Sequence, residues 1–199
     1  MKAADRTLSE IRALCTKAAR GVGCPWGLAE EAGMAARILH AHGLPGCEAL
    51  AALFATPRDC GCEEGDDKPT CGLVALAALS DALPERAAEL GDVAGPLLLL
   101  APLLQEAQSG FAWRVEWDSG FAECAAAGPS IEGRPAPKVS SVRITRLACS
   151  EHGEAPSWRS RAVSEQAWEQ LEALAARTYV PESETSREGG AGPDAADTD

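Results

Sequence analysis

A group of three cysteines is the most specific candidate for chemistry in this sequence of 199 residues. Cys60-Gly61-Cys62 is followed by Cys71, and thiolates are among the ligands that Zn²⁺ prefers. The first pair has a single intervening residue, closer than is usual in zinc sites, and no second pair follows. A complete site would need Cys47, His40 or His42 as a further ligand. The spacing favours the alternative, an acidic surface loop whose thiols bind no metal.

Positive charge gathers between residues 128 and 162 of an otherwise acidic chain. Arginine side chains bind small anions through two parallel hydrogen bonds, so this region is a candidate anion site. Arg143 and Arg146 are expected on opposite faces of one strand, where they do not form a simple patch. The alternative is a solvated sheet face that pairs with the acidic loop or tail. The basic residues of this region are Arg134, Lys138, Arg143, Arg146, Arg159 and Arg161.

Two aromatic residues lie beside rigid turns, in Pro25-Trp26-Gly27 and in Tyr179-Val180-Pro181. Aromatic side chains at such bends line ligand clefts in some proteins. More often they close the edge of the core, which is the interpretation that we favour. If they bind a ligand, we expect it between the sheet and the turn at Trp26. The ligand-binding candidates of the sequence are Trp26, Arg143, Arg146, Tyr179 and Arg187.

The three histidines give weaker signals. His40 and His42 are two residues apart at the end of a predicted helix, so they point to different sides. They are not the i, i+4 pair of a helix-borne metal site, and we expect them to interact with the exposed carbonyls and the helix dipole. His152 and Cys149 are a candidate base and nucleophile, but no third group at a defined spacing orients them. A histidine in a surface loop is the favoured alternative.

Composition and charge limit the classes of function. The chain has 18 Lys and Arg against 30 Asp and Glu, a formal charge of −12. Broad binding to nucleic acids or to anionic membranes needs a positive field, so we expect neither partner. The longest apolar stretch, residues 93–104, is too short to span a bilayer, and the N-terminus lacks the apolar segment of a secretory signal. We therefore expect a cytoplasmic protein.

Five further cysteines are scattered among alanines and aliphatic residues. In a chain of this length without a visible secretory signal, a disulfide framework is not expected. A cysteine in such surroundings behaves as a small buried hydrophobe. The cysteines to which this applies are Cys15, Cys24, Cys47, Cys124 and Cys149.

Helical periodicity dominates the first half of the chain. Thr7-Leu8-Ser9-Glu10 matches a capping box, and Gly21 and Gly23 end the helix that it begins. Pro25 is suited to the start of a second helix, since its missing N–H costs nothing there. Further helices are expected over residues 47–55, 71–83 and 84–90, whereas residues 96–108 fit either a buried strand or a helix.

The second half begins with a strand signal. Residues 111–117 alternate large apolar side chains with Ala, Arg and Glu, which is the period of a strand. A turn follows, and a two-residue loop at Ser119-Gly120 would place Trp117 opposite Ala122. Residues 128–137 are expected as a loop and residues 139–147 as a third strand. One face of this sheet is apolar and needs a helical cover.

Ser164 predicts the start of that covering helix. Val163 before it and Trp168 inside it have the hydrophobic-staple arrangement. The expected fold class is α+β, with an N-terminal helical layer packed on a small antiparallel sheet of about three or four strands and one C-terminal helix. Residues 1–108 form the helical region and residues 109–180 the sheet with its closing helix, in one continuous domain. Residues 181–199 are an acidic, glycine-rich tail.

A resemblance to a known family rests on two stretches. One runs from Leu8-Ser9-Glu10-Ile11 to Pro25-Trp26-Gly27-Leu28-Ala29-Glu30-Glu31-Ala32-Gly33. The other is Arg177-Thr178-Tyr179-Val180-Pro181-Glu182-Ser183-Glu184 with Ser186-Arg187 and Gly190-Ala191-Gly192. They resemble an uncharacterised bacterial family, domain of unknown function 3726, over nearly the whole chain, with a departure at Gly192-Pro193-Asp194. The resemblance implies a functional tail but carries over no activity and no site residue.

The sequence favours binding over catalysis. Charge is abundant, yet no acid–base pair, nucleophile set or metal-ligand set has a spacing that supports chemistry. We expect a non-catalytic binding or accessory protein for a small anionic metabolite or a partner subunit, without a cofactor. One alternative is the cysteine-based metal-binding module. The other is an enzyme completed by the tail or a second subunit. Its site would draw on Ser183, Glu184 and Arg187, with Glu30 or Glu31.

Overall fold

The computed structural model describes residues 3–55, 69–133, 135–148 and 161–179, and it confirms a fold that mixes helices and strands. Six α-helices lie in this described part: α1 (Leu8–Gly21), α2 (Trp26–Ala41), α3 (Gly46–Ala55), α4 (Gly72–Asp81), α5 (Leu100–Ala107) and α6 (Glu165–Ala175). Its strands are β1 (Ala3–Arg6), β2 (Thr70–Cys71), β3 (Ala87–Ala94), β4 (Ala112–Trp117), β5 (Gly120–Ala125), β6 (Gly128–Glu132), β7 (Lys138–Leu147) and β8 (Arg161–Ser164). Short 3-10 helices are η1 (Pro96–Leu99) and η2 (Ala176–Thr178).

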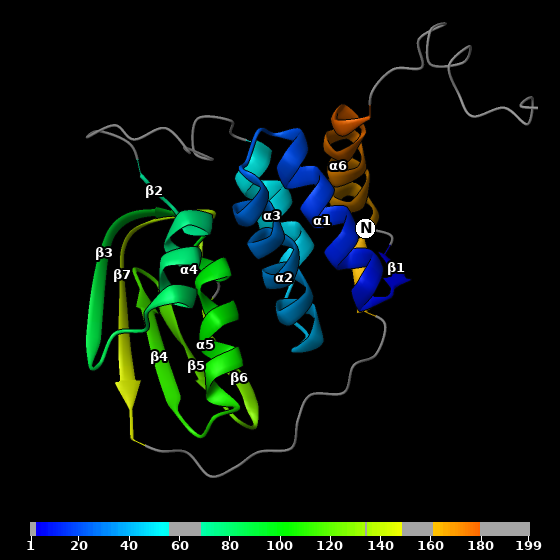
Figure 1. The fold of residues 1–199 in the computed structure, drawn as a ribbon. Helices are drawn as coiled ribbons and strands as arrows, with labels where there is room; N and C mark the ends of the chain where they lie inside the picture. Colours follow the sequence, from blue (N-terminus) through cyan, green and yellow to red (C-terminus); the bar gives the residue numbers. More distant parts are fainter. Residues whose placement is uncertain (1–2, 56–68, 134, 149–160, 180–199) are drawn as a thin grey trace, which may run out of the picture.

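The helices form layers on one side of a large sheet (Figure 1). This sheet has the strand order β2-β3-β7-β4-β5-β6, in which only β2 and β3 are parallel neighbours. α4 and α5 cover one of its faces, and α2 packs on both of these helices. α1, α3 and α6 follow, with β1 and β8 paired as a small second sheet. α4 and α5 therefore lie between the large sheet and α2.

The alternating segment with two tryptophans forms β4, as predicted. Trp113, Val115 and Trp117 face the helical layer and expose only 2%, 0% and 6% of their surface. Arg114 and Glu116 point to the opposite face, where they stay partly exposed. The prediction that helices of the same chain cover these tryptophans is confirmed, but the helix predicted to do so, α6 after Ser164, is the wrong one, because α6 packs on α1 and α3.

The pairing of β4 with β5 differs from the predicted register by two residues. Trp117 pairs with Gly120 and not with Ala122, so the two-residue loop is Asp118-Ser119. The Asp118 carboxylate fixes this turn, because it accepts hydrogen bonds from the backbone N–H and the hydroxyl of Ser140 at 2.8 and 2.7 Å. A shift of two residues leaves every side chain on its predicted face, since side chains alternate along a strand.

Two segments predicted as helix and loop are strands. In the segment 84–90, residues from Ala87 onward belong to β3, which pairs with β7. Ala, Glu and Leu favour helices, but such local preferences are small in energy and the pairing of β3 with β7 overrides them. Residues 128–132, predicted as a loop, form the edge strand β6. The large sheet thus has more strands than predicted, and β1, β2 and β3 interrupt the region 1–108 that was expected to be helical.

Several predicted helix starts are confirmed. Thr7 and Glu10 form both halves of the capping box, since the Glu10 carboxylate accepts the Thr7 backbone N–H at 2.8 Å and the Thr7 hydroxyl accepts the Glu10 N–H. α2 begins directly after Pro25. α6 begins after Ser164, whose hydroxyl accepts a hydrogen bond from the Ala167 backbone N–H. The ambiguous residues 96–108 are helical, as η1 and α5.

One connected apolar core joins the layers. Buried side chains of the helices and of the large sheet belong to a single cluster. The predicted boundary near residue 108 is untested and stays a prediction, and the tail 181–199 lies outside the described residues. In the described part of the chain, no helix has both the length and the apolar character needed to cross a membrane.

Gly33 allows α2 to approach α1 closely, and this contact can be tested. A Cβ atom at Gly33 would clash with the Thr16 side chain and would lie 2.7 Å from the Arg12 carbonyl oxygen. We expect Gly33→Ala to lower the free energy of unfolding by about 1–3 kcal/mol in urea denaturation. Gly27 on the same helix has open space at the Cβ position, so Gly27→Ala should leave stability unchanged or raise it by up to about 1 kcal/mol. If both substitutions change the free energy of unfolding equally, the close approach of α2 to α1 at Gly33 is not what requires glycine there.

Candidate functional site

Two buried thiols meet between α1 and α3. The side chains of Cys15 and Cys47 are fully buried, and their Sγ atoms lie 3.8 Å apart, within hydrogen-bonding distance for sulfur. Cys47 is the second residue of α3, directly after Gly46. A Cβ atom at Gly46 would lie 2.8 Å from the Ala36 Cα on α2, so glycine is needed for this approach. The close packing of α3 on α2 thus brings Cys47 into the core beside Cys15.

A histidine and a glutamate complete this group, which we call the thiol cluster: Cys15, His40, Cys47 and Glu48. His40 is buried near the end of α2, and its Nε2 accepts a hydrogen bond from the Cys47 backbone N–H at 3.0 Å. The same nitrogen lies 3.7 Å from Oε2 of the Glu48 carboxylate, which places the glutamate beside the imidazole.

The two carboxylate oxygens of Glu48 have different surroundings. Oε1 accepts a hydrogen bond from the Ser164 backbone N–H at 2.8 Å, which joins α3 to the start of α6. Oε2 is buried and has no hydrogen-bond partner among the described residues. An unpartnered buried oxygen costs free energy, which the hydrogen bond from the Ser164 N–H to Oε1 offsets in part.

The hydrogen bond between the thiols changes their acidities in opposite directions. It lowers the pKa of Cys47 to about 6, because the Cys15 S–H stabilises the Cys47 thiolate; His40 adds to this effect and burial opposes it. The same hydrogen bond and burial raise the pKa of Cys15 well above its usual range. Burial raises the pKa of Cys124, a buried thiol on β5, to about 12. Cys47 is therefore the more acidic thiol, and oxidation is the chemistry open to the pair.

An apolar pocket of about 470 Å³ lies where α3 meets the edge of the large sheet. Its walls come from the turn between α2 and α3, from α3 itself, from the start of η1 and from the segment after β6. The lining, as far as it is described, consists of aliphatic, proline and glycine residues and has no titratable side chain. Lining residues include Leu44, Ala52, Leu53, Leu97, Ile131 and Pro137.

The structure does not bring Arg143 and Arg146 together. They lie on opposite faces of β7, as predicted. Arg143 is exposed, and its guanidinium lies 2.7 Å from the Glu89 carboxylate on β3. The Arg146 guanidinium lies 3.8 Å from the centre of the Phe111 ring. Their role in anion binding stays a prediction.

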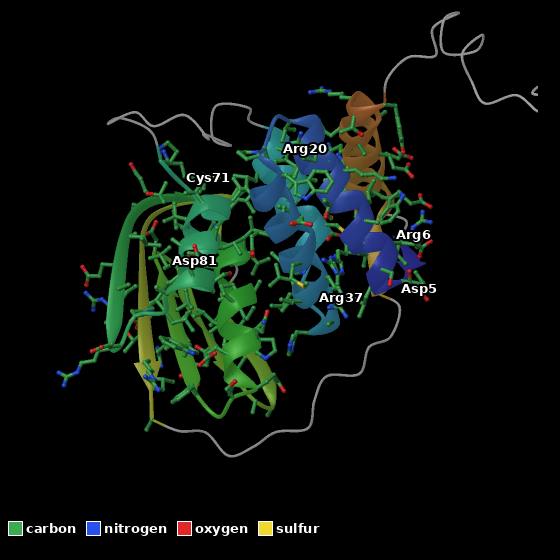
Figure 2. The ribbon with its side chains drawn as sticks, in the orientation of Figure 1. Asp5, Arg6, Arg20, Arg37, Cys71 and Asp81 are labelled. Atoms are coloured by element: carbon green, nitrogen blue, oxygen red, sulfur yellow. The ribbon has the colours of Figure 1, made fainter. Side chains whose placement is uncertain are left out.

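Trp26 and Tyr179 are both largely exposed, at 62% and 63%. The favoured interpretation, that they close the edge of the core, is therefore wrong. The Trp26 ring lies 5.7 Å from the guanidinium of Arg20, which Figure 2 places at the end of α1. The Tyr179 ring lies at the same distance from the Lys17 ammonium. α4 and α5 separate α2 from the large sheet, so the expected cleft between the sheet and Trp26 is filled by helices, and Arg187 lies outside the described residues.

The predicted cysteine metal site stays a prediction. Cys60 and Cys62 lie outside the described residues, while Cys71 is buried at the junction of β2 and α4 (Figure 2). Within residues 3–55, 69–133, 135–148 and 161–179, no group of three or more His, Cys, Asp or Glu side chains is arranged to hold a metal ion. In the thiol cluster, the Nε2 lone pair of His40 is directed at the Cys47 N–H and is not available as a ligand.

Sequence reasoning missed the thiol cluster. It treats Cys15 and Cys47 as separate buried hydrophobes and assigns His40 to contacts at a helix end. The burial is confirmed, also for Cys24 and Cys124, whereas Cys149 lies outside the described residues. Since 32 residues separate the two cysteines, no local spacing reveals their contact. The available signal is that each lies on the apolar side of its helix.

Comparison with known proteins gives a match to a family model over part of the chain. Residues 6–82 match the family model described as "Protein of unknown function (DUF3726)", which confirms the resemblance for this region. The whole thiol cluster lies inside the match, whereas the second resembling stretch, from Arg177 onward, lies outside it. No curated protein and no solved structure matches the chain.

Glu48 is expected to stabilise the junction of α3 and β8. Glu48→Ala removes the acceptor of the Ser164 N–H, so we expect the free energy of unfolding to fall by about 1–3 kcal/mol. Glu48→Gln keeps an acceptor oxygen and should cost less than half as much. Glu169→Ala, an exposed glutamate of α6, serves as control and should stay within about 0.5 kcal/mol of the parent in urea denaturation. If Glu48→Gln lowers the free energy of unfolding as much as Glu48→Ala does, the stabilising role of the hydrogen bond to Ser164 is contradicted.

Proposed function

We propose that this protein is a binding protein that holds an apolar small molecule in the pocket between α3 and the edge of the large sheet. The supporting observation is the volume of about 470 Å³, lined by aliphatic side chains. Ligand sites are concave and mostly apolar, with volumes of about 300–1,000 Å³. A molecule with two or three linked rings fits this space.

The lining favours an uncharged ligand, or the uncharged part of one. Leu44, Leu97 and Ile131 offer hydrocarbon contacts, and the described lining has no cationic side chain. Against this described lining, an anion would lose its hydration without gaining a charged partner. The proposal therefore changes the ligand class, from the small anion expected from the sequence to a molecule whose buried part is apolar.

Binding without catalysis is the class that this pocket supports. General acid–base and nucleophilic catalysis need a titratable side chain beside the ligand, and the described lining offers none. The alternative of an enzyme completed by the tail stays a prediction, since residues 183, 184 and 187 lie outside the described residues. This alternative also uses Glu30 or Glu31 of α2. Glu30 is exposed, and the Glu31 carboxylate accepts a hydrogen bond from the Ser80 hydroxyl at 3.4 Å.

A pair of fluorescent probes tests the pocket. N-phenyl-1-naphthylamine is neutral, and 8-anilinonaphthalene-1-sulfonate carries the same rings with a negative charge. We expect saturable binding of the neutral probe with a Kd between roughly 10 and 200 μM. This range corresponds to a binding free energy of about 0.3–0.4 kcal/mol for each non-hydrogen atom of the probe. The sulfonate should bind more weakly, because its charge has no partner in the described lining. The measurement is a fluorescence titration of the full chain.

Substitutions that fill the pocket locate the bound probe. Ala52 is exposed on α3 and lines the pocket, so Ala52→Phe should occupy the space and weaken binding about tenfold or more. Ala78 is exposed on α4 and does not line the pocket, so Ala78→Phe should leave the Kd unchanged. The proposal fails if the neutral probe shows no saturable binding, or if both variants change the Kd equally. Tighter binding of the sulfonate would favour the anionic ligand instead.

A further inference from the structure

We propose that Cys15 and Cys47 form a site of oxidative modification, at which hydrogen peroxide converts the two thiols into a disulfide that ties α1 to α3. The positions of the two sulfur atoms support this proposal. The two Sγ atoms already lie 3.8 Å apart, and a disulfide needs about 2.0 Å. The two Sγ atoms therefore have to move closer by about 1.8 Å. The order and pairing of the helices and strands stay as they are.

The surroundings of Cys47 differ from those of an inert buried cysteine. Cys47 lies in the first turn of α3, where the helix dipole favours a thiolate. From the elements packed against it, the polar and titratable groups that face it are Cys15 of α1 and His40 of α2, with Glu48 beside it on α3. Cys15 and His40 lower the pKa of Cys47, against the opposing effects of burial and of the Glu48 charge, whereas burial alone raises the pKa of Cys124.

Burial restricts the oxidant. Both thiols of the pair are fully buried, so a bulky disulfide such as oxidised glutathione is excluded from the folded chain. Hydrogen peroxide is neutral and little larger than water, and brief opening of the helical layer is enough to admit it. The thiol cluster has no residue in the lining of the apolar pocket, so oxidation and ligand binding are tested separately.

The chemistry balances in two steps. The Cys47 thiolate attacks one oxygen of the peroxide, which breaks the O–O bond, leaves Cys47 as a sulfenic acid and releases hydroxide. The Cys15 thiol then attacks the sulfenic sulfur; the S–S bond forms, the S–O bond breaks, and the leaving hydroxyl takes up the Cys15 proton to become water, while the hydroxide of the first step passes to solvent. Two sulfur atoms are oxidised by two electrons in total, and one peroxide is reduced.

Peptide mapping of the oxidised full chain tests the site. The reduced protein is treated with one equivalent of peroxide, remaining thiols are blocked under denaturing conditions, and trypsin is added. Cys15 falls in the peptide 13–17 and Cys47 in the peptide 38–58. We expect these two peptides to appear joined and lighter by two hydrogens than their sum, with loss of two thiols per chain. The oxidised protein should also have a raised Tm, since the bond restricts the unfolded chain.

Three variants assign the roles. Cys124→Ser should give the same joined peptides as the parent. Cys15→Ser should stop at the Cys47 sulfenic acid, which dimedone labels, and Cys47→Ser should leave Cys15 unlabelled. The proposal is overturned if the parent keeps both thiols under these conditions, if peroxide joins other cysteines while these two stay reduced, or if Cys124 is oxidised as fast as Cys47. If a variant does not fold, the peptide map of the parent protein still tests whether Cys15 and Cys47 form the disulfide.

Discussion

Burial of the tryptophan face of β4 under the helical layer is the interaction on which the rest of the fold depends. Each of Trp113 and Trp117 removes about 150–250 Å² from water, an upper estimate of about 4–6 kcal/mol. Neither indole N–H has a hydrogen-bond partner within the described residues, at a cost of about 1–3 kcal/mol each. Burial of the rings outweighs this cost, so the apolar area holds the helices on the sheet and specific hydrogen bonds do not.

The opposite face of the same sheet shows why its arginines do not gather into one anion site. The Arg114 guanidinium lies 2.9 Å from the Glu123 carboxylate and 3.8 Å from the centre of the Phe121 ring. Arg143 has its own carboxylate on the neighbouring strand. Exposed pairs of this kind contribute at most about 1 kcal/mol each, so they serve charge balance more than stability. Cross-strand pairing thus neutralises arginines that stand out in an acidic sequence.

The helical layers hold the part of the molecule with the most distinctive chemistry. Cys15, Cys47 and Cys124 are equally buried, yet their acidities differ because their neighbours differ. Cys124 lies in an apolar environment, where burial disfavours the thiolate. Cys47 has a thiol donor and an imidazole beside it at the start of a helix. Burial by itself therefore does not decide whether a cysteine is structural or reactive.

Local patterns in the sequence determined where helices begin and which side of a strand is apolar. The capping box at Thr7, the cap at Ser164 and the alternation in residues 111–117 each depend on residues a few positions apart, and all three are confirmed. Tertiary structure alone decided that residues 87–94 form a strand, that Trp117 pairs with Gly120, and that Cys15 meets Cys47. The physical reason is that these outcomes depend on partners brought close by packing, and their energies exceed the weak preferences of the local chain.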